Sequence, residues 1–247
     1  MSHPGFTFLA EAYWDLEWEL LQQGFDYCYD KRLYDRVRDG DANAIRAHLA
    51  AGLDYQARLA RFLENHDEPR AAATFSWQQL QAAAIVTYFA PGLRFLDEGQ
   101  LEGARVHVPT HLRRGPIEQL SVDIRGFYDR LLAVIGISEV FREGIWSLIA
   151  PQPAWQGNPT WQDFVPYAWQ ARNGERFIVV VNYSNHQAQC YLPLPFADMR
   201  GDRFCLADVM GSERYDRDGN GLTVPGLYVD LAAWKYNVFR IEPIRSA

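Results

Sequence analysis

The feature that most constrains the fold is a change in the order of predicted elements near residue 150. Before it, short apolar strands alternate with stretches whose apolar residues recur at helical spacing. After it, short strands follow one another, with turns and no helix signal between them. Alternation is typical of a parallel sheet covered by helices, and consecutive short strands are typical of an antiparallel sandwich. The chain therefore predicts an α/β part over residues 1–150 and an all-β part over residues 151–247.

The α/β part contains four predicted strands, of which the second has the weakest signal. They are 5–14 (GFTFLAEAYW), 25–30 (FDYCYD), Phe62-Leu63 and 93–99 (LRFLDEG). Helical spacing begins at Asp41 and continues to the third strand. A second helix is predicted over 76–90, with Ser76 as N-cap and Pro91-Gly92 as its stop, and a third over 116–136, with Pro116 at its first position.

Composition excludes several classes of function. The 247-residue chain has a net charge of −7 and a pI near 5.4, so no basic face is available for nucleic acid. It has no apolar run long enough to span a bilayer, and its start lacks the basic region of a signal peptide. We therefore predict no membrane partner and a cytoplasmic protein. The three cysteines are scattered without metal-ligand spacing and predict buried thiols.

Polar side chains follow two of the predicted strands. Glu11 follows an apolar run in FLAEAYW, and Asn65, His66 and Asp67 follow another in FLENHDEPR. In parallel β/α folds, active sites gather at the carboxyl ends of strands. Two carboxyls at such ends suit a general acid and a charge-stabilising carboxylate. Taken singly, Glu11 is typical of a helix N-terminus or a solvated loop, and Asn-His-Asp is typical of a turn.

The order of these motifs resembles the α-amylase family, glycoside hydrolase family 13, over essentially the whole chain. The matching segments are FLAEAYW, FLENHD and PGLRFLDEGQ, followed by the predicted sandwich. The resemblance implies the C-terminal half of a (β/α)8 barrel, with strands 5 to 8 of that barrel, and then an antiparallel β-sandwich. It implies a glycoside hydrolase or transglycosylase that acts on α-glucosidic bonds by a retaining mechanism. The implied partner is an α-glucan or maltooligosaccharide.

The resemblance also implies residue roles. Glu11 matches the general acid/base, and Asp67 matches the carboxylate that stabilises the transition state. His66 matches a residue that hydrogen-bonds sugar hydroxyls, and Asn65 belongs to the same substrate-binding motif.

Three neighbouring residues are predicted to bind substrate, each with an alternative. Tyr13 and Trp14 follow the acid and match aromatic residues on the leaving-group side, although core packing explains them equally well. Arg70 is a candidate for a sugar subsite, but an ion pair that stabilises the loop explains Arg70 and Glu68 as well.

The chain departs from the family in one decisive respect. The nucleophilic Asp of the family lies at the end of the fourth strand in a G-x-R-x-D sequence, and this chain contains none. A whole barrel needs eight strands and about 250 residues. We therefore expect an isolated chain without activity, from a truncated gene model, with exposed barrel edges open to self-association. The alternative is a non-catalytic carbohydrate-binding or regulatory remnant of the family.

A last motif, YDRDGNG over residues 215–221, resembles the first half of a calcium loop. Asp216, Asp218 and Asn220 have the spacing, but Leu227 stands where a bidentate Glu should close the loop. A tight hairpin turn explains the motif as well. We predict no cofactor, with calcium at these residues as the weaker alternative.

Overall fold

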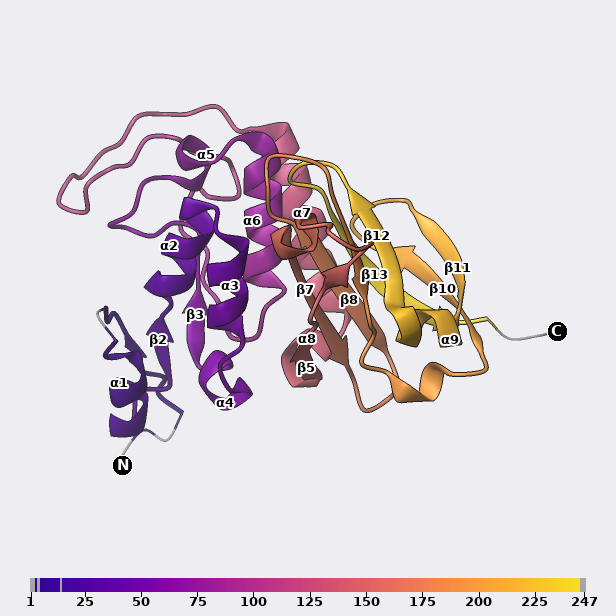
Figure 1. Cartoon of the computed structure of the whole chain (residues 1–247). Helices are drawn as coiled ribbons and strands as arrows, with labels where there is room; N and C mark the ends of the chain where they lie inside the picture. Colours follow the sequence, from indigo (N-terminus) through magenta and orange to yellow (C-terminus); the bar gives the residue numbers. More distant parts are fainter. Residues whose placement is uncertain (1–2, 4, 14, 245–247) are drawn as a thin grey trace.

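The computed structural model describes residues 3, 5–13 and 15–244. The chain first forms a parallel sheet with helices and then two antiparallel sheets (Figure 1). The parallel sheet has the strand order β1-β2-β3-β4. Its strands are β1 (Leu9–Ala10), β2 (Tyr27–Tyr29), β3 (Leu59–Arg61) and β4 (Leu93–Arg94). All four predicted strands are present, and the third ends one residue before the predicted Phe62.

Helices follow each of these strands. They are α1 (Glu17–Gln23), α2 (Lys31–Asp39), α3 (Ala42–Leu49), α4 (Leu53–Gln56), α5 (Ala71–Thr74), α6 (Trp77–Tyr88), α7 (Val122–Ile137) and α8 (Val140–Glu143). The predicted N-cap of α6 is confirmed, because the Gln79 amide donates to Ser76 Oγ over 3.4 Å. The Gln79 side chain accepts the Ser76 amide in return, over 3.2 Å, which completes a capping box.

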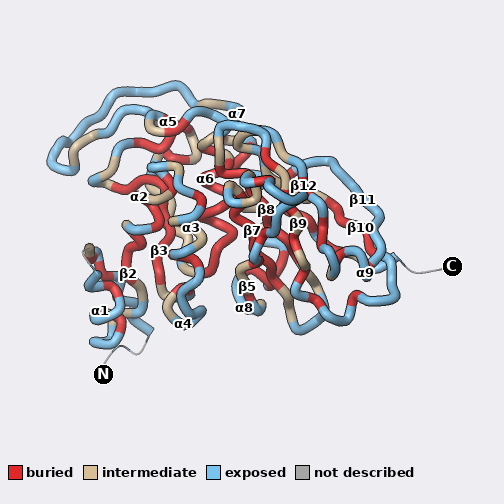
Figure 2. Tube along the Cα trace, in the orientation of Figure 1, coloured by how far each residue is buried: buried red, intermediate tan, exposed pale blue. Residues whose placement is uncertain are grey.

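The helix predicted to begin at Pro116 begins instead at Val122, with Ser121 as its N-cap. The prediction was wrong because Glu118 is used by the preceding loop: its carboxylate accepts the backbone amides of Arg105 and Val106 over 2.8 and 3.1 Å. Residues 104–120 therefore form a long loop without regular structure, which projects beyond α5 and is largely exposed (Figures 1 and 2).

The two faces of the parallel sheet differ. On one face, Tyr29 lies against Phe62 and Phe95 with ring centroids 5.4 and 5.3 Å apart, so aromatic rings fill the space. The same face is open toward the sheet edges, where Leu9 and Leu93 are each 36% exposed. The other face is covered by helices. The exposure predicted for the sheet edges is therefore present at Leu9 and Leu93.

A buried ion pair joins the central strands. Arg61 at the end of β3 is fully buried, and its guanidinium pairs with Asp30, the residue that follows β2. Asp30 also accepts the Leu33 amide over 3.1 Å and so caps α2. Burial lowers the pKa of His48 to about 4 and keeps the imidazole neutral. Its Nε2 donates to the Asp30 carboxylate over 3.0 Å. Arg61 Nε donates to the Pro91 carbonyl over 2.8 Å, which fixes the turn before β4.

The backbone of this turn requires glycine at position 92. Its φ is +124°, and a Cβ there would lie 2.3 Å from the Leu59 carbonyl oxygen. Only glycine allows the chain to pass so close to β3, so the Pro91-Gly92 signal marks both the end of α6 and the entry to β4.

The second part of the chain is antiparallel. Its strands are β5 (Ile145–Leu148), β6 (Gln152–Pro153), β7 (Phe164–Gln170), β8 (Arg176–Asn182), β9 (Ala188–Leu192), β10 (Arg203–Asp208), β11 (Arg214–Asp218), β12 (Leu227–Leu231) and β13 (Tyr236–Pro243). One sheet has the order β11-β10-β13-β8-β7-β5 and the other the order β12-β9-β6. Short helical segments are η1 (Thr160–Asp163), η2 (Ala197–Met199), α9 (Gly219–Gly221) and η3 (Leu222–Gly226). This antiparallel part begins at β5, a few residues before the predicted boundary at 151.

The six-stranded sheet is buried on both faces at its centre. In β8, Ile178 and Val180 belong to the core shared with the smaller sheet, whereas Val179 and Val181 belong to the core shared with the helices. The continuous apolar run FIVVV follows from this double burial. Helix α6 lies on the helical side of the sheet (Figure 1), and Tyr167 Oη donates to the Ile85 carbonyl over 3.0 Å.

Two further predictions concern the cysteines and membrane-spanning helices. Cys28, Cys190 and Cys205 are free and buried, which confirms the prediction of buried thiols. Among the described residues, no helix combines the length and apolar character needed to cross a membrane.

The ion pair between Asp30 and Arg61 gives a first prediction. Asp30→Asn leaves a buried guanidinium without its counter-charge, so we expect the free energy of unfolding to fall by about 3–5 kcal/mol. Asp35→Asn is the matched control, because Asp35 lies in α2, the helix that Asp30 caps, and its side chain is 37% exposed. The control should cost at most about 1 kcal/mol. Denaturant unfolding of both variants measures this, and equal costs would contradict the assignment.

Candidate active site

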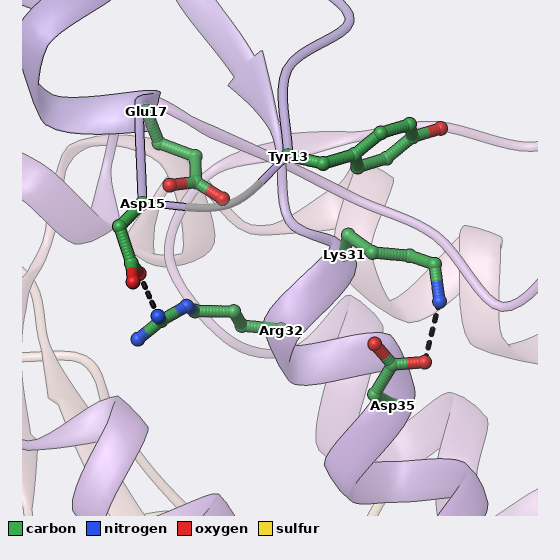
Figure 3. Close-up of a pocket in the computed structure, with 6 residues that line it drawn as sticks. All are labelled: Tyr13, Asp15, Glu17, Lys31, Arg32 and Asp35. Carbon is green, nitrogen blue, oxygen red and sulfur yellow. Dashed lines mark hydrogen bonds and ion pairs between the residues drawn. The ribbon is translucent and has the colours of Figure 1, made fainter.

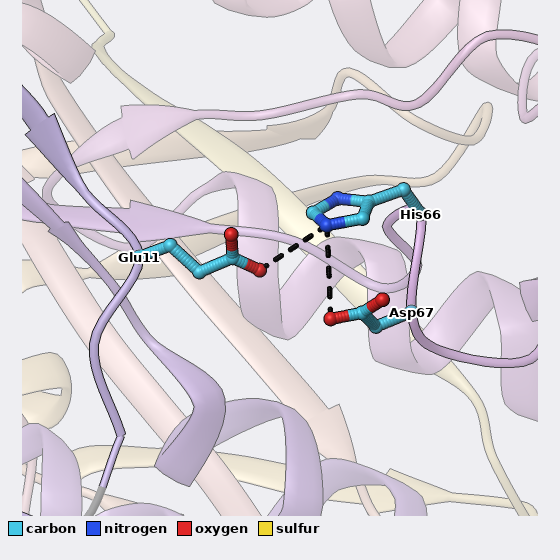
Figure 4. A group of neighbouring side chains, drawn as sticks. All are labelled: Glu11, His66 and Asp67. Atoms are coloured by element: carbon cyan, nitrogen blue, oxygen red, sulfur yellow. Dashed lines mark ion pairs between the residues drawn. The ribbon is translucent and has the colours of Figure 1, made fainter. Parts of the chain in front are cut away.

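Three of the predicted site residues meet at the carboxyl ends of the parallel strands. Glu11 comes directly after β1, and His66 and Asp67 lie in the loop after β3. His66 Nε2 lies 3.3 Å from Glu11 Oε1 and 3.6 Å from Asp67 Oδ2 (Figure 4). Strand β2 lies between β1 and β3, so these side chains approach one another across the end of the strand between them.

Tyr13 belongs to the same group. Its hydroxyl donates to Glu11 Oε1 over 3.1 Å. Burial, and next the neighbouring Glu11, raise the pKa of Tyr13 well above its usual value, so the phenol stays protonated and remains a donor. Trp14 lies outside the described residues, and its predicted role stays a prediction.

Asn65 shapes the loop that carries His66 and Asp67. It is fully buried, and its Oδ1 accepts the backbone amides of Asp67 and Glu68, each over 2.9 Å. The turn interpretation of the motif is thus confirmed for Asn65. Asn65 thus positions the next two residues, and its own contact with substrate stays a prediction.

No model of a known protein family matches the chain, and no curated protein does. Solved structures do match. An α-amylase from Geobacillus thermoleovorans, in complex with acarbose, superposes with a TM-score of 0.75 at 16% identity, over 97% of this chain and 54% of that one. A maltogenic α-amylase from Thermotoga neapolitana gives 0.72 at 18%, over 95% and 54%.

The chain has the fold of the α-amylase family. A debranching enzyme from Nostoc punctiforme also superposes, with a TM-score of 0.68 at 14% identity over 96% of this chain and 51% of that one. The chain thus spans about half the length of the solved structures it matches. The resemblance that the motifs indicated is therefore confirmed at the level of the fold.

Within this α-amylase fold, Arg70 has a structural place. It is 8% exposed, and its guanidinium pairs with Glu64 over 2.8 Å and with Asp97 over 2.9 Å. Burial raises the pKa of Glu64 to about 7. The Ala71 amide and the charge of Arg70 lower this pKa and so limit the rise. The ion-pair interpretation is confirmed by these two contacts, and substrate binding by Arg70 stays a prediction. Glu68, in turn, pairs with Lys31 over 3.1 Å.

Two residues near the site were not predicted. Tyr29 lies beneath it on β2, where burial, and next the charges of Glu11, Asp97 and Asp67, raise the pKa of its hydroxyl. The alternation of Tyr27 and Tyr29 in YCY is the signal that places both on one face of the strand. His107, from the long loop, places its Nε2 2.8 Å from the His66 carbonyl oxygen. No local pattern marks His107, because this contact depends on how the loop folds.

A pocket of about 510 Å³ adjoins the site (Figure 3). Its lining is Tyr13, Asp15, Glu17, Lys31, Arg32 and Asp35. Arg32 pairs with Asp15 and Lys31 with Asp35, so both signs of charge face the pocket. Because Tyr13 contacts Glu11 and also lines the pocket, the pocket continues the site along the chain that follows β1.

The calcium candidate has a different local structure. Asp216 and Asp218 lie in β11, and the Asp218 carboxylate accepts the backbone amides of Asn220 and Gly221, over 2.9 and 3.3 Å. The motif thus forms the N-cap of α9. The predicted hairpin turn is wrong, since β11 and β12 lie in different sheets. The calcium alternative stays a prediction.

The place of Arg70 gives a second prediction. Arg70→Met leaves Glu64 buried without its partner and should lower the free energy of unfolding by about 3–5 kcal/mol. Arg125→Met is the matched control, because Arg125 also lies between two carboxylates, Glu102 and Asp129, but its side chain is 42% exposed. The control should cost at most about 1 kcal/mol. If the two variants unfold at the same denaturant concentration, the structural role of Arg70 is wrong.

Proposed function

We propose that this chain carries the general acid and the transition-state-stabilising carboxylate of a retaining glycoside hydrolase or transglycosylase that acts on α-glucosidic bonds. The observation that carries the proposal is the convergence of Glu11, His66 and Asp67 at the carboxyl ends of the parallel strands, in an α-amylase fold. The matched structure from Geobacillus thermoleovorans is a complex with acarbose, which supports a carbohydrate ligand.

Each residue has a chemical role in this proposal. Glu11 gives its proton to the glycosidic oxygen as the leaving sugar departs and takes a proton from the incoming water or sugar hydroxyl. Tyr13 holds the Glu11 carboxyl in place through its hydrogen bond. Asp67 and His66 hydrogen-bond the hydroxyls of the sugar ring, and the Asp67 charge stabilises the oxocarbenium-like transition state.

The proposal includes the architecture around the site. We assign β1 to β4 as strands 5 to 8 of a (β/α)8 barrel over residues 1–150 and the antiparallel sheets as the sandwich domain over residues 151–247. In support, β1 and β4 are the end strands of their sheet, and the matched chains are about twice as long. The chain contains no G-x-R-x-D sequence for a nucleophile. The isolated chain should therefore be inactive, and its sheet edges open to self-association.

The pocket beyond Tyr13 would take the sugars on the leaving-group side. Its charged lining offers several donors and acceptors for sugar hydroxyls, and Tyr13 offers a ring face. Trp14 is the second aromatic candidate for this side, as the motif implies.

A second candidate function is a non-catalytic carbohydrate-binding or regulatory protein. The absence of the nucleophile motif from the sequence favours it. The two functions share the sugar-facing residues and differ only in turnover, so one set of variants tests both.

The third prediction concerns acarbose binding. We expect acarbose to bind the isolated chain in isothermal titration calorimetry, and His66→Ala and Asp67→Asn to weaken binding by about tenfold or more, since each removes a hydrogen bond to or from a polar ligand at a charged site. His186→Ala is the matched control, because His186 is also an exposed histidine paired with a carboxylate, that of Asp163 at 2.9 Å. Equal affinity in all variants would contradict the proposed site.

Turnover separates the two functions. We expect the isolated chain to release no reducing sugar from maltooligosaccharides. Hydrolysis by this chain that is abolished in Glu11→Gln would overturn the inactive assignment and the non-catalytic alternative together. Hydrolysis that survives in Glu11→Gln would overturn the role of Glu11.

A further inference from the structure

We propose that Glu11, His66 and Asp67 form a binding site for a divalent transition-metal ion of the Zn²⁺ class. Among the described residues, these three make up the one group of three or more His, Cys, Asp or Glu whose ligand atoms lie within 4.8 Å of one another. The inference goes beyond the sugar chemistry proposed above and does not depend on it.

The separations of the ligand atoms fit a small tetrahedral site. Zn²⁺ binds imidazole nitrogen and carboxylate oxygen at about 2.0–2.2 Å, which places two tetrahedral ligands about 3.3–3.6 Å apart. His66 Nε2 lies 3.3 Å from Glu11 Oε1 and 3.6 Å from Asp67 Oδ2. Two edges of the coordination tetrahedron are therefore already formed, and the third requires only that the two carboxylates close toward each other (Figure 4).

The ligand types select the class of metal. One neutral imidazole and two carboxylates suit Zn²⁺, and the imidazole disfavours Mg²⁺ and Ca²⁺, which prefer oxygen ligands alone. The two carboxylates also neutralise the charge of a divalent ion. The three side chains are 41%, 39% and 59% exposed, for Glu11, His66 and Asp67, so an ion reaches them from solvent and keeps one open position.

The ligands are held from behind. Asn65 fixes the backbone of Asp67 through its side-chain oxygen, and His107 contacts the His66 carbonyl oxygen over 2.8 Å. Tyr13 donates to the Glu11 carboxylate, as outer-shell partners of ligating carboxylates do. Because these partners already hold the ligands in place, less entropy is lost when a metal fixes the side chains.

Other histidine–carboxylate pairs in the described chain lack this set. His186 faces the single carboxylate of Asp163, and His48 is buried against Asp30, whose charge Arg61 already neutralises. They serve as internal comparisons, because a pair alone does not supply three ligands.

The metal would use the same lone pairs as the sugar chemistry. A metal bound to Glu11 displaces the proton that a general acid must carry. The ion and a sugar would thus exclude each other, and metal binding would inhibit any catalysis at this site.

The test is titration of the untagged chain with ZnCl2 by calorimetry, with Co²⁺ absorption as a spectroscopic readout of the coordination. We expect one site, Co²⁺ bands typical of tetrahedral nitrogen and oxygen ligands, and affinity reduced at least about tenfold in His66→Ala, Glu11→Gln and Asp67→Asn, since loss of an outer-shell partner alone costs 10–100-fold. His186→Ala should leave the affinity unchanged. Circular dichroism checks that each variant is folded, as expected for exposed side chains.

Two results with the variants would overturn the inference: affinity equal to wild type in all three ligand variants, or affinity lost in His186→Ala. Absence of saturable Zn²⁺ binding to the wild-type chain would overturn it as well. These outcomes are independent of the acarbose titration, because Zn²⁺ binding without acarbose binding removes the sugar proposal alone, and the reverse removes the metal proposal alone.

Discussion

The buried pair of Arg61 and Asp30 is the interaction on which the rest of the α/β part depends. It joins the ends of two neighbouring strands, caps α2 and holds the turn that leads into β4. Glu11 and His66 meet directly beyond the end of β2, the strand that Asp30 follows. The separation of these two side chains depends on the alignment of β1, β2 and β3, and the ion pair joins the ends of the last two.

The features that were predicted from the sequence are those that depend on neighbouring residues. The four parallel strands follow from the pattern of neighbouring residues, and the N-cap at Ser76 follows from its residue type at the start of a helical pattern. The convergence of Glu11, His66 and Asp67 was predicted because parallel strands bring their carboxyl ends to one edge. Each of these inferences needs only the sequence around the element and a rule about sheets.

The misses share a different cause. The sequence offered an ion pair as one interpretation of Arg70, but its partner Asp97 is brought to the guanidinium only by the fold. The helix predicted from Pro116 fails because Glu118 binds amides of residues 105 and 106, which its own neighbours do not reveal. The role of Tyr29 likewise depends on which strands flank β2. Contacts between distant segments decide these cases.

The contact between α6 and the antiparallel sheet has a consequence for when the two parts of the molecule fold and unfold. Tyr167 and Trp169 of β7 donate to the carbonyls of Ile85, Val86 and Phe89, at the end of a helix that precedes them by about 80 residues. Until β7 has been synthesised, these hydrogen bonds and the packing of α6 on the antiparallel sheet cannot form. The boundary near residue 150 separates two architectures but does not separate two cooperative units. Both parts should therefore fold and unfold together.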